Sequence, residues 1–315
     1  MPGSIEKANN LAGLARRRVA IDPLSKPVYA VLGLALGAEV AILAASDFYL
    51  GSPSLPLNLA QLIALAIAAA FVRGLGFERA ALFIEAVCIL PIAGALAVTA
   101  TVFMAAISGP FADPWLAAAD RALGFDFKAL VQFYGQHPWI ATLSRYAYMS
   151  FAIQASLVPV LLALAGHGQR MWILFNAWVL SLLVAVLVFP LVPAAGPFAY
   201  HGIAQDVFEQ WKRLFPWETG PAISALRDGS MRDVTAAARG FISLPSFHAA
   251  GGAMFIWACW DLRTLRWPML ALNLALIAST IVTGAHYLID IIAGLALAAA
   301  ALHLSLRWNS PRSAA

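Results

Sequence analysis

Two short stretches near the C-terminal end of the chain carry histidines in patterns that could support catalysis. Residues 243–248 read Ser-Leu-Pro-Ser-Phe-His, and residues 284–290 read Gly-Ala-His-Tyr-Leu-Ile-Asp. In the second stretch, His286 and Asp290 are four residues apart, so on a helix they would share one face and could touch. An imidazole held by a carboxylate, with the imidazole of His248 nearby, is suited to phosphoryl or acyl transfer through a histidine.

The composition of the chain makes these polar groups costly. Of the 315 residues, 62% are hydrophobic and 11% are charged, and the mean hydropathy of +0.79 excludes an ordinary soluble domain. Ionisable side chains in membrane-spanning segments are expensive, so His248, His286 and Asp290 are functional candidates. The net charge of +4 is not gathered into a basic stripe with interleaved aromatic residues, so we expect no nucleic-acid partner.

Apolar runs that are long enough to cross a bilayer recur along the chain and predict an all-α integral membrane protein. We expect about eight spans, of which the sixth and seventh are short. Their approximate ranges are 28–48, 57–74, 83–108, 141–165, 171–192, 246–262, 267–284 and 286–307.

Basic residues concentrate in alternate loops, which is the positive-inside pattern. This pattern places both termini in the cytoplasm and both histidine stretches on the outer, periplasmic or lumenal, side. We therefore expect a multi-pass protein of a bacterial inner membrane whose site faces the periplasm. The first apolar run comes after Arg16–Arg18 and is followed directly by further spans, so it predicts an anchor rather than a cleaved signal peptide.

The segment between the third and fourth spans, residues 110–140, does not resemble a span, because it combines helical spacing with mixed charge and recurring aromatic residues. We expect it to lie along the outer interface, either as a lid over a lipid entrance or as a re-entrant connection. The expected divisions of the chain are a basic cytoplasmic tail (1–26), two N-terminal transmembrane helices (27–82), a catalytic membrane domain (83–308) and a second cytoplasmic tail (309–315).

Other polar residues inside apolar runs have simpler interpretations. Glu39 and Glu85 are expected to be neutral or paired between helices rather than part of a transport path. Cys88 and Cys259 offer neither a disulfide framework nor zinc spacing, so they are expected to be packing residues.

The local sequence predicts how the histidines are held. Proline is favoured in the first turn of a helix, so a helix is expected to begin near Pro245 with His248 in its first turn, and Ser243 and Ser246 could cap its amides. The small residues at 249–253 would let a neighbouring helix approach closely. His286 is expected to open the last helix, with Asp290 one turn deeper and both histidines at one depth.

Both stretches resemble elements of the type 2 phosphatidic acid phosphatase (PAP2) superfamily, a six-helix membrane fold of lipid phosphatases and phosphotransferases. Residues 245–248 match its Pro-Ser-x-His element, and residues 284–294 match its Gly-x-His-Tyr-x-x-Asp-x-x-x-Gly element. The resemblance covers residues 83–307. It implies a six-helix core preceded by two extra transmembrane helices.

The resemblance also implies roles for the three candidates: His286 attacks phosphorus, Asp290 holds its other ring nitrogen, and His248 protonates the leaving oxygen. The chemistry agrees, because a carboxylate behind an imidazole fixes its tautomer and stabilises the cation that forms. We expect no metal and no cofactor, since the sequence offers no carboxylate cluster to hold an ion. The expected substrate-binding residues are Ser246, Arg239, Ser243, Tyr287 and Arg145.

The sequence departs from the phosphatase branch of the family in its cations. That branch carries Lys-x6-Arg-Pro, which has no match here, and an arginine where this chain has Thr280. A dianionic phosphate monoester needs several cations around it, so these losses favour a phosphodiester with one negative charge. The candidates to replace the missing charges are Arg239, ranked first, and then Arg232, Arg227, Lys212, Arg213 and Arg145.

The pattern is more similar to the branch that contains inositol phosphorylceramide synthases, which move a phospho-head-group from a phospholipid to a lipid alcohol. We therefore favour a lipid phosphotransferase that acts through a phosphohistidine, with membrane lipids as its partners. The alternative is a lipid or polyprenyl phosphate phosphatase. A transporter that uses Glu39, Glu85 and the histidines is less favoured, because transporters usually show repeats and broken helices in both halves.

Overall fold

The computed structural model describes residues 24–204 and 217–309, and this part of the chain is built from helices. Six helices are long and apolar enough to cross a membrane. They are α2 (Lys26–Ala45), α3 (Ser54–Gly74), α4 (Glu78–Ala106), α7 (Pro138–Leu164), α8 (Gly168–Val188) and α14 (Leu288–Asn309). The prediction of an all-α integral membrane protein is confirmed.

Two further apolar helices, α12 (Phe247–Cys259) and α13 (Arg266–Val282), lie where the short sixth and seventh spans are predicted. With 13 residues, α12 is about 20 Å long, against about 30 Å for the hydrocarbon core of a bilayer. Irregular backbone at residues 238–246 leads into the N-terminal end of α12.

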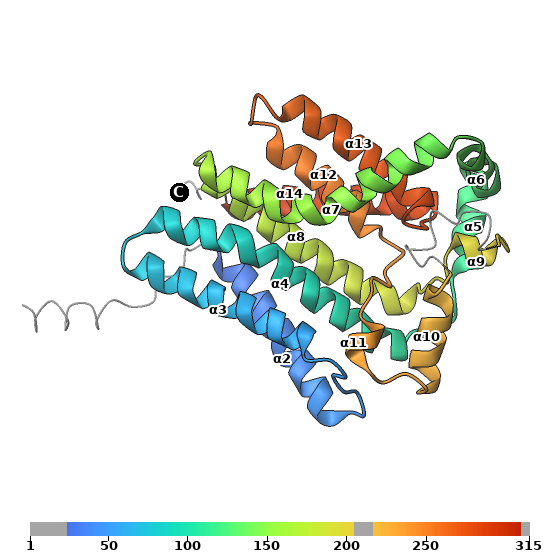
Figure 1. The fold of residues 1–315 in the computed structure, drawn as a ribbon, viewed down its shortest axis with the longest axis horizontal. Helices are drawn as coiled ribbons and strands as arrows, with labels where there is room; N and C mark the ends of the chain where they lie inside the picture. The colour runs from blue at the N-terminus through green and yellow to red at the C-terminus, as the bar shows by residue number, and fades with distance from the viewer. Residues whose placement is uncertain (1–23, 205–216, 310–315) are drawn as a thin grey trace, which may run out of the picture.

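The central helix of the bundle is α8, which packs against α4, α12 and α14 (Figure 1). Its large side chains Trp172, Phe175 and Trp178 are buried in the main apolar core. The small residues of α12 permit close packing, as predicted. A Cβ at Gly251 would lie 2.4 Å from the ring of Phe151 and 3.0 Å from that of Trp178.

The shorter helices gather at one end of the bundle (Figure 1). They are α5 (Asp113–Ala122), α6 (Phe127–Gln136), the 3-10 helix η1 (Phe189–Leu191), α9 (Pro197–Tyr200), α10 (Thr219–Asp228) and α11 (Val234–Ala237). The segment 110–140 thus contains two short helices before α7 begins, and α5 packs against α9 and α14. Segment 110–140 therefore connects α4 to α7 and does not itself form a span, as predicted.

At the other end of the bundle, an ion pair joins α3 to α4. Arg73 makes two hydrogen bonds of 2.6 Å to the carboxylate of Glu85, and the Tyr29 hydroxyl donates to the same carboxylate at 2.9 Å. In the middle of α2, Glu39 accepts a hydrogen bond of 2.5 Å from the hydroxyl of Thr99. The interpretation of Glu39 and Glu85 as residues paired between helices therefore agrees with their contacts.

Candidate active site

The first turn of α12 is fixed onto α14 by backbone contacts. The Ser246 hydroxyl accepts from the amide of Ala249 at 3.4 Å, so it caps α12 as predicted. The Ser246 amide donates to the carbonyl of Asp290 at 2.9 Å. A Cβ at Gly294 would lie 2.2 Å from the Ser246 carbonyl oxygen, so only glycine permits this approach. The helix that carries His248 is thereby held against the helix that carries Asp290.

His286 lies in the turn between α13 and α14, whereas the sequence predicts that it opens the last helix. The helix begins two residues later, at Leu288, because Ala285 adopts a left-handed φ of 54° and the His286 amide donates to the carbonyl of Ile281 at 3.1 Å. The contact predicted from the spacing nevertheless exists. Nδ1 of His286 lies 3.3 Å from Oδ2 of Asp290.

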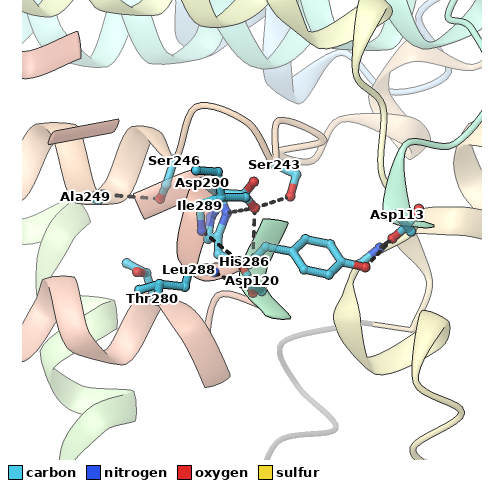
Figure 2. A network of polar contacts seen from close by, with 12 residues as sticks. Asp113, Asp120, Ser243, Ser246, Ala249, Thr280, His286, Leu288, Ile289 and Asp290 are labelled. Carbon is cyan, nitrogen blue, oxygen red and sulfur yellow. Dashed lines mark hydrogen bonds and ion pairs between the residues drawn. The ribbon is translucent and has the colours of Figure 1, made fainter. Parts of the chain in front are cut away.

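Asp290 is fully buried, and one of its oxygens gathers several polar groups (Figure 2). Besides Nδ1 of His286, Oδ2 accepts from the Ser243 hydroxyl at 2.6 Å and from the Tyr287 amide at 3.0 Å. Ser243 was expected to cap α12 and instead orients the carboxylate. With Nδ1 turned toward Asp290, Nε2 is the nitrogen of His286 that can act on a substrate.

Two carboxylates of α5 fix the backbone around His286, and we call them the α5 clamp (Figure 2). Asp113 accepts hydrogen bonds of 2.8 Å from the amides of Ala195 and Gly196 and from the Tyr287 hydroxyl. Asp120 accepts hydrogen bonds of 2.9 Å from two amides in the first turn of α14, those of Leu288 and Ile289. Burial raises the pKa of Asp120, although both amide bonds favour its ionised form.

The α5 clamp was not predicted from the sequence. The available signal was the seven-residue spacing of Asp113 and Asp120, which places both on one face of a helix. Their partners are backbone amides far along the chain, and no side-chain pattern marks these.

Tyr287 was expected to contact substrate, but the structure places its side chain elsewhere. The residue is fully buried, and its hydroxyl lies on Asp113. Burial and the Asp113 carboxylate raise the pKa of this hydroxyl, so it stays a neutral donor. Tyr287 therefore links the clamp to the turn that holds His286.

Two adjoining cavities lie at the histidines, and we name each after its histidine. The His286 cavity, of about 110 Å³, is lined by His286, Ser243 and mostly small residues from the neighbouring turns. The His248 cavity, of about 590 Å³, lies between α4, α7, α8 and α12 and is mainly apolar. Their shared wall is formed by Tyr148, Thr219, Gly240 and Ile242.

Aromatic rings hold His248 at the end of its cavity. Its imidazole stacks on the ring of Tyr148, with the centroids 4.4 Å apart, and lies equally close to the ring of Phe151. Tyr148 also approaches the second histidine stretch, since a Cβ at Gly284 would lie 2.8 Å from its ring. Nothing in the sequence distinguishes Tyr148, because aromatic residues are common in membrane spans.

The candidate arginines lie apart from the His286 cavity. Arg239 lines the His248 cavity and pairs with Glu218 at 2.9 Å, and Arg145 lies over the ring of Tyr146. Arg227 and Arg232 donate to backbone carbonyls and stack on Phe111 and Phe48. Lys212 and Arg213 fall outside the described residues. Among the described residues, no lysine or arginine lines the His286 cavity.

Comparison with known proteins identifies the class. The family model of the PAP2 superfamily matches residues 114–304, which is more than half of the chain and includes Asp120 and both histidine stretches. The chain belongs to the PAP2 superfamily, and this membership supports a lipid enzyme of the phosphatase or phosphotransferase type. No curated protein and no solved structure matches the chain.

Proposed function

We propose that the protein transfers a phospho-head-group from a membrane phospholipid to a lipid alcohol through a phosphohistidine on His286. The observation that carries this proposal is the pairing of two cavities. The smaller one, at His286, has no cationic side chain among its described lining residues, and it adjoins a large apolar cavity at His248. A singly charged phosphodiester suits the first cavity, and a lipid alcohol suits the second.

In the first half of the reaction, Nε2 of His286 attacks phosphorus and forms a P–N bond. The P–O bond to the diacylglycerol oxygen of the donor breaks, and His248 gives its proton to that oxygen. Asp290 accepts from Nδ1–H and stabilises the positive charge that develops on the ring. Ser243 supports this step because it holds the carboxylate in place.

In the second half, the hydroxyl of the acceptor lipid attacks phosphorus while neutral His248 takes its proton. The P–N bond breaks, His286 returns to its neutral form, and the phosphodiester of the acceptor leaves. The apolar wall of the His248 cavity favours an alcohol with a long chain over water at this point.

Product analysis with purified protein tests the proposal. A phospholipid donor with a labelled head-group is supplied with and without a long-chain alcohol acceptor. We expect a labelled phosphodiester of the acceptor, and no turnover in His286→Ala. Release of inorganic phosphate from phosphatidic acid or a polyprenyl phosphate, independent of the acceptor, would support the phosphatase alternative instead.

We also propose that this chemistry takes place on the outer face of a bacterial inner membrane. The positive-inside pattern puts the loop between α2 and α3 outside and the loop between α12 and α13 inside. Cys88 and Cys259 are fully buried, so a cysteine introduced at Asp47 or at Arg263 can be labelled selectively. A membrane-impermeant maleimide should label Asp47→Cys and spare Arg263→Cys in intact cells. The reverse pattern would refute this orientation.

A further inference from the structure

The His286 cavity must hold a phosphoryl group without help from a lysine or arginine in its described wall. Charge on phosphate oxygens has to be met by hydrogen-bond donors or by cations, because desolvating an unpaired charge is expensive. The question is therefore which neutral donors face this cavity.

The N-terminal end of α10 provides one set of donors. Thr219, its first residue, lies in the wall shared by both cavities. The first amides of a helix have no acceptor within the helix, and together with the helix dipole they form an anion site. In α10 these donors are the amides of Thr219 and Gly220, because Pro221 has no amide hydrogen and the Ala222 amide donates to the Glu218 carbonyl. The preceding residue, Glu218, does not cap these amides with its side chain, which pairs with Arg239 instead.

The end of α13 provides an independent observation. Thr283 is 3% exposed and lines the His286 cavity, and its hydroxyl has no hydrogen-bond partner within the part of the chain that the structure describes. A buried hydroxyl without a partner is destabilising, so its presence beside the cavity points to a ligand that accepts its hydrogen bond.

Thr283 differs in this respect from its neighbours on α13. The hydroxyls of Ser279 and Thr280 donate to carbonyls one turn back within the helix. Thr280 occupies the position where the phosphatase branch has an arginine. The Thr280 hydroxyl therefore does not take the place of the arginine of the phosphatase branch, because it already donates within α13. Three residues further along, the Thr283 hydroxyl has no partner among the described residues and is free to donate to a ligand.

We propose that the hydroxyls of Thr283 and Thr219, with the first amides of α10, form a neutral cradle for the phosphoryl oxygens. This inference rests on the proposed function and specifies its substrate class: a phosphodiester with one negative charge rather than a dianionic monoester. Neutral donors satisfy one delocalised charge, whereas a second charge needs a cation.

The cradle is tested with two chromogenic probes, a nitrophenyl phosphodiester with an alkyl chain and nitrophenyl phosphate. Thr283→Val removes the hydroxyl at constant shape and should lower kcat/KM for the diester roughly 10- to 100-fold, as expected for a lost hydrogen bond to a charged group. Thr283→Ser restores the donor and should recover most of this loss. Thr219→Val should lower the same quantity.

Thr99→Val is the matched control. It also removes a buried threonine hydroxyl, but that hydroxyl donates to Glu39 of α2 and faces neither cavity. We expect it to change the unfolding temperature without changing kcat/KM of the folded protein. Thr219→Lys brings a cation to the shared wall, so it should raise the ratio of monoester to diester turnover.

The outcomes separate the two proposals. Wild-type kcat/KM in both Thr283→Val and Thr219→Val, together with an inactive His286→Ala, would refute the cradle and leave the proposed function intact. Turnover in His286→Ala would refute the proposed function itself. An unchanged substrate ratio in a folded Thr219→Lys would show that charge at this wall does not select the substrate.

Discussion

The His286 ring is oriented by the Asp290 carboxylate in the first turn of α14 and by the donors that hold this carboxylate. Oδ2 of Asp290 receives the Nδ1 nitrogen together with a hydroxyl and an amide, and the carboxylate is closed to water. A carboxylate held by several donors keeps its position when the imidazole beside it becomes positively charged, so in the proposed mechanism it can stabilise that charge.

The environment of His248 leads to a prediction about leaving groups. Its imidazole lies against two aromatic rings and lines the mainly apolar His248 cavity, and in the proposed mechanism it gives its proton to the leaving oxygen of a lipid bound there. His248→Ala should lower turnover of a phospholipid donor by roughly 10²–10⁴-fold, the usual contribution of a general acid. A nitrophenyl phosphodiester should lose far less, because nitrophenolate leaves without a proton.

The measurement is kcat for both donors in wild type and in His248→Ala. His137→Ala, a change at a partly exposed histidine at the C-cap of α6, is the control and should affect neither donor. Equal losses for both donors in His248→Ala would assign this residue to binding or structure instead.

Among the elements, α5 has the strongest influence on the site, although it contributes no group that reacts. Its two carboxylates accept from the amides of two backbone segments, the first turn of α14 and the segment at Ala195 and Gly196, and Asp113 also accepts from the Tyr287 hydroxyl. The contacts with the first turn of α14 act on main-chain atoms next to His286, so we expect them to fix the backbone there whatever substrate is bound.

Asp120→Asn tests the positioning role of α5. The amide side chain keeps one acceptor and loses the other, so one amide of α14 is left without its partner. We expect a loss of about 1 kcal/mol in stability, as for other helix caps, together with a lower kcat because the turn at His286 shifts. KM should change little, since Asp120 lines neither cavity.

Asp126→Asn is the matched control for this prediction. Asp126 also caps a helix, because its carboxylate accepts from the amide of Ala129. The helix that it caps is α6, whereas Asp120 accepts from amides of α14. This variant should lose a similar amount of stability and retain wild-type kcat. Equal kcat in both variants, measured on the folded protein, would show that Asp120 is only a structural cap.

The sequence predicted these elements unevenly, for physical reasons. Hydropathy located the apolar helices, because a bilayer imposes length and composition on each of them. The spacing of His286 and Asp290 predicted their contact even though the helix begins later than expected. The α5 clamp and the orphan hydroxyl of Thr283 could not be predicted, because both depend on where distant backbone segments meet.

At the scale of the whole molecule, the candidate active site lies at one end of the bundle, and the buried Arg73–Glu85 ion pair lies near the other end. The short helices surround the site at one end, while α3 and α4 are joined near the other (Figure 1). The helices α2 and α3 pack on α4 through apolar contacts, the Glu39 contact and the Arg73–Glu85 ion pair. We therefore expect these two helices to contribute stability rather than chemistry.

Glu85→Gln tests this division of roles. It leaves the guanidinium of Arg73 buried without its main counter-charge, which costs about 3–5 kcal/mol when one partner of a buried pair is lost. The matched control is Glu78→Gln, because the Glu78 carboxylate also contacts Arg73 but its side chain is 63% exposed, and such pairs contribute about 1 kcal/mol or less.

Thermal unfolding in detergent should show a large drop in midpoint for Glu85→Gln and a small one for Glu78→Gln. Phosphotransfer per folded molecule should stay at the wild-type level in both, since neither residue lines the His286 or His248 cavity. A folded Glu85→Gln protein with reduced turnover would show instead that the attachment of α2 and α3 is coupled to the site through α4, whose residues line the His248 cavity.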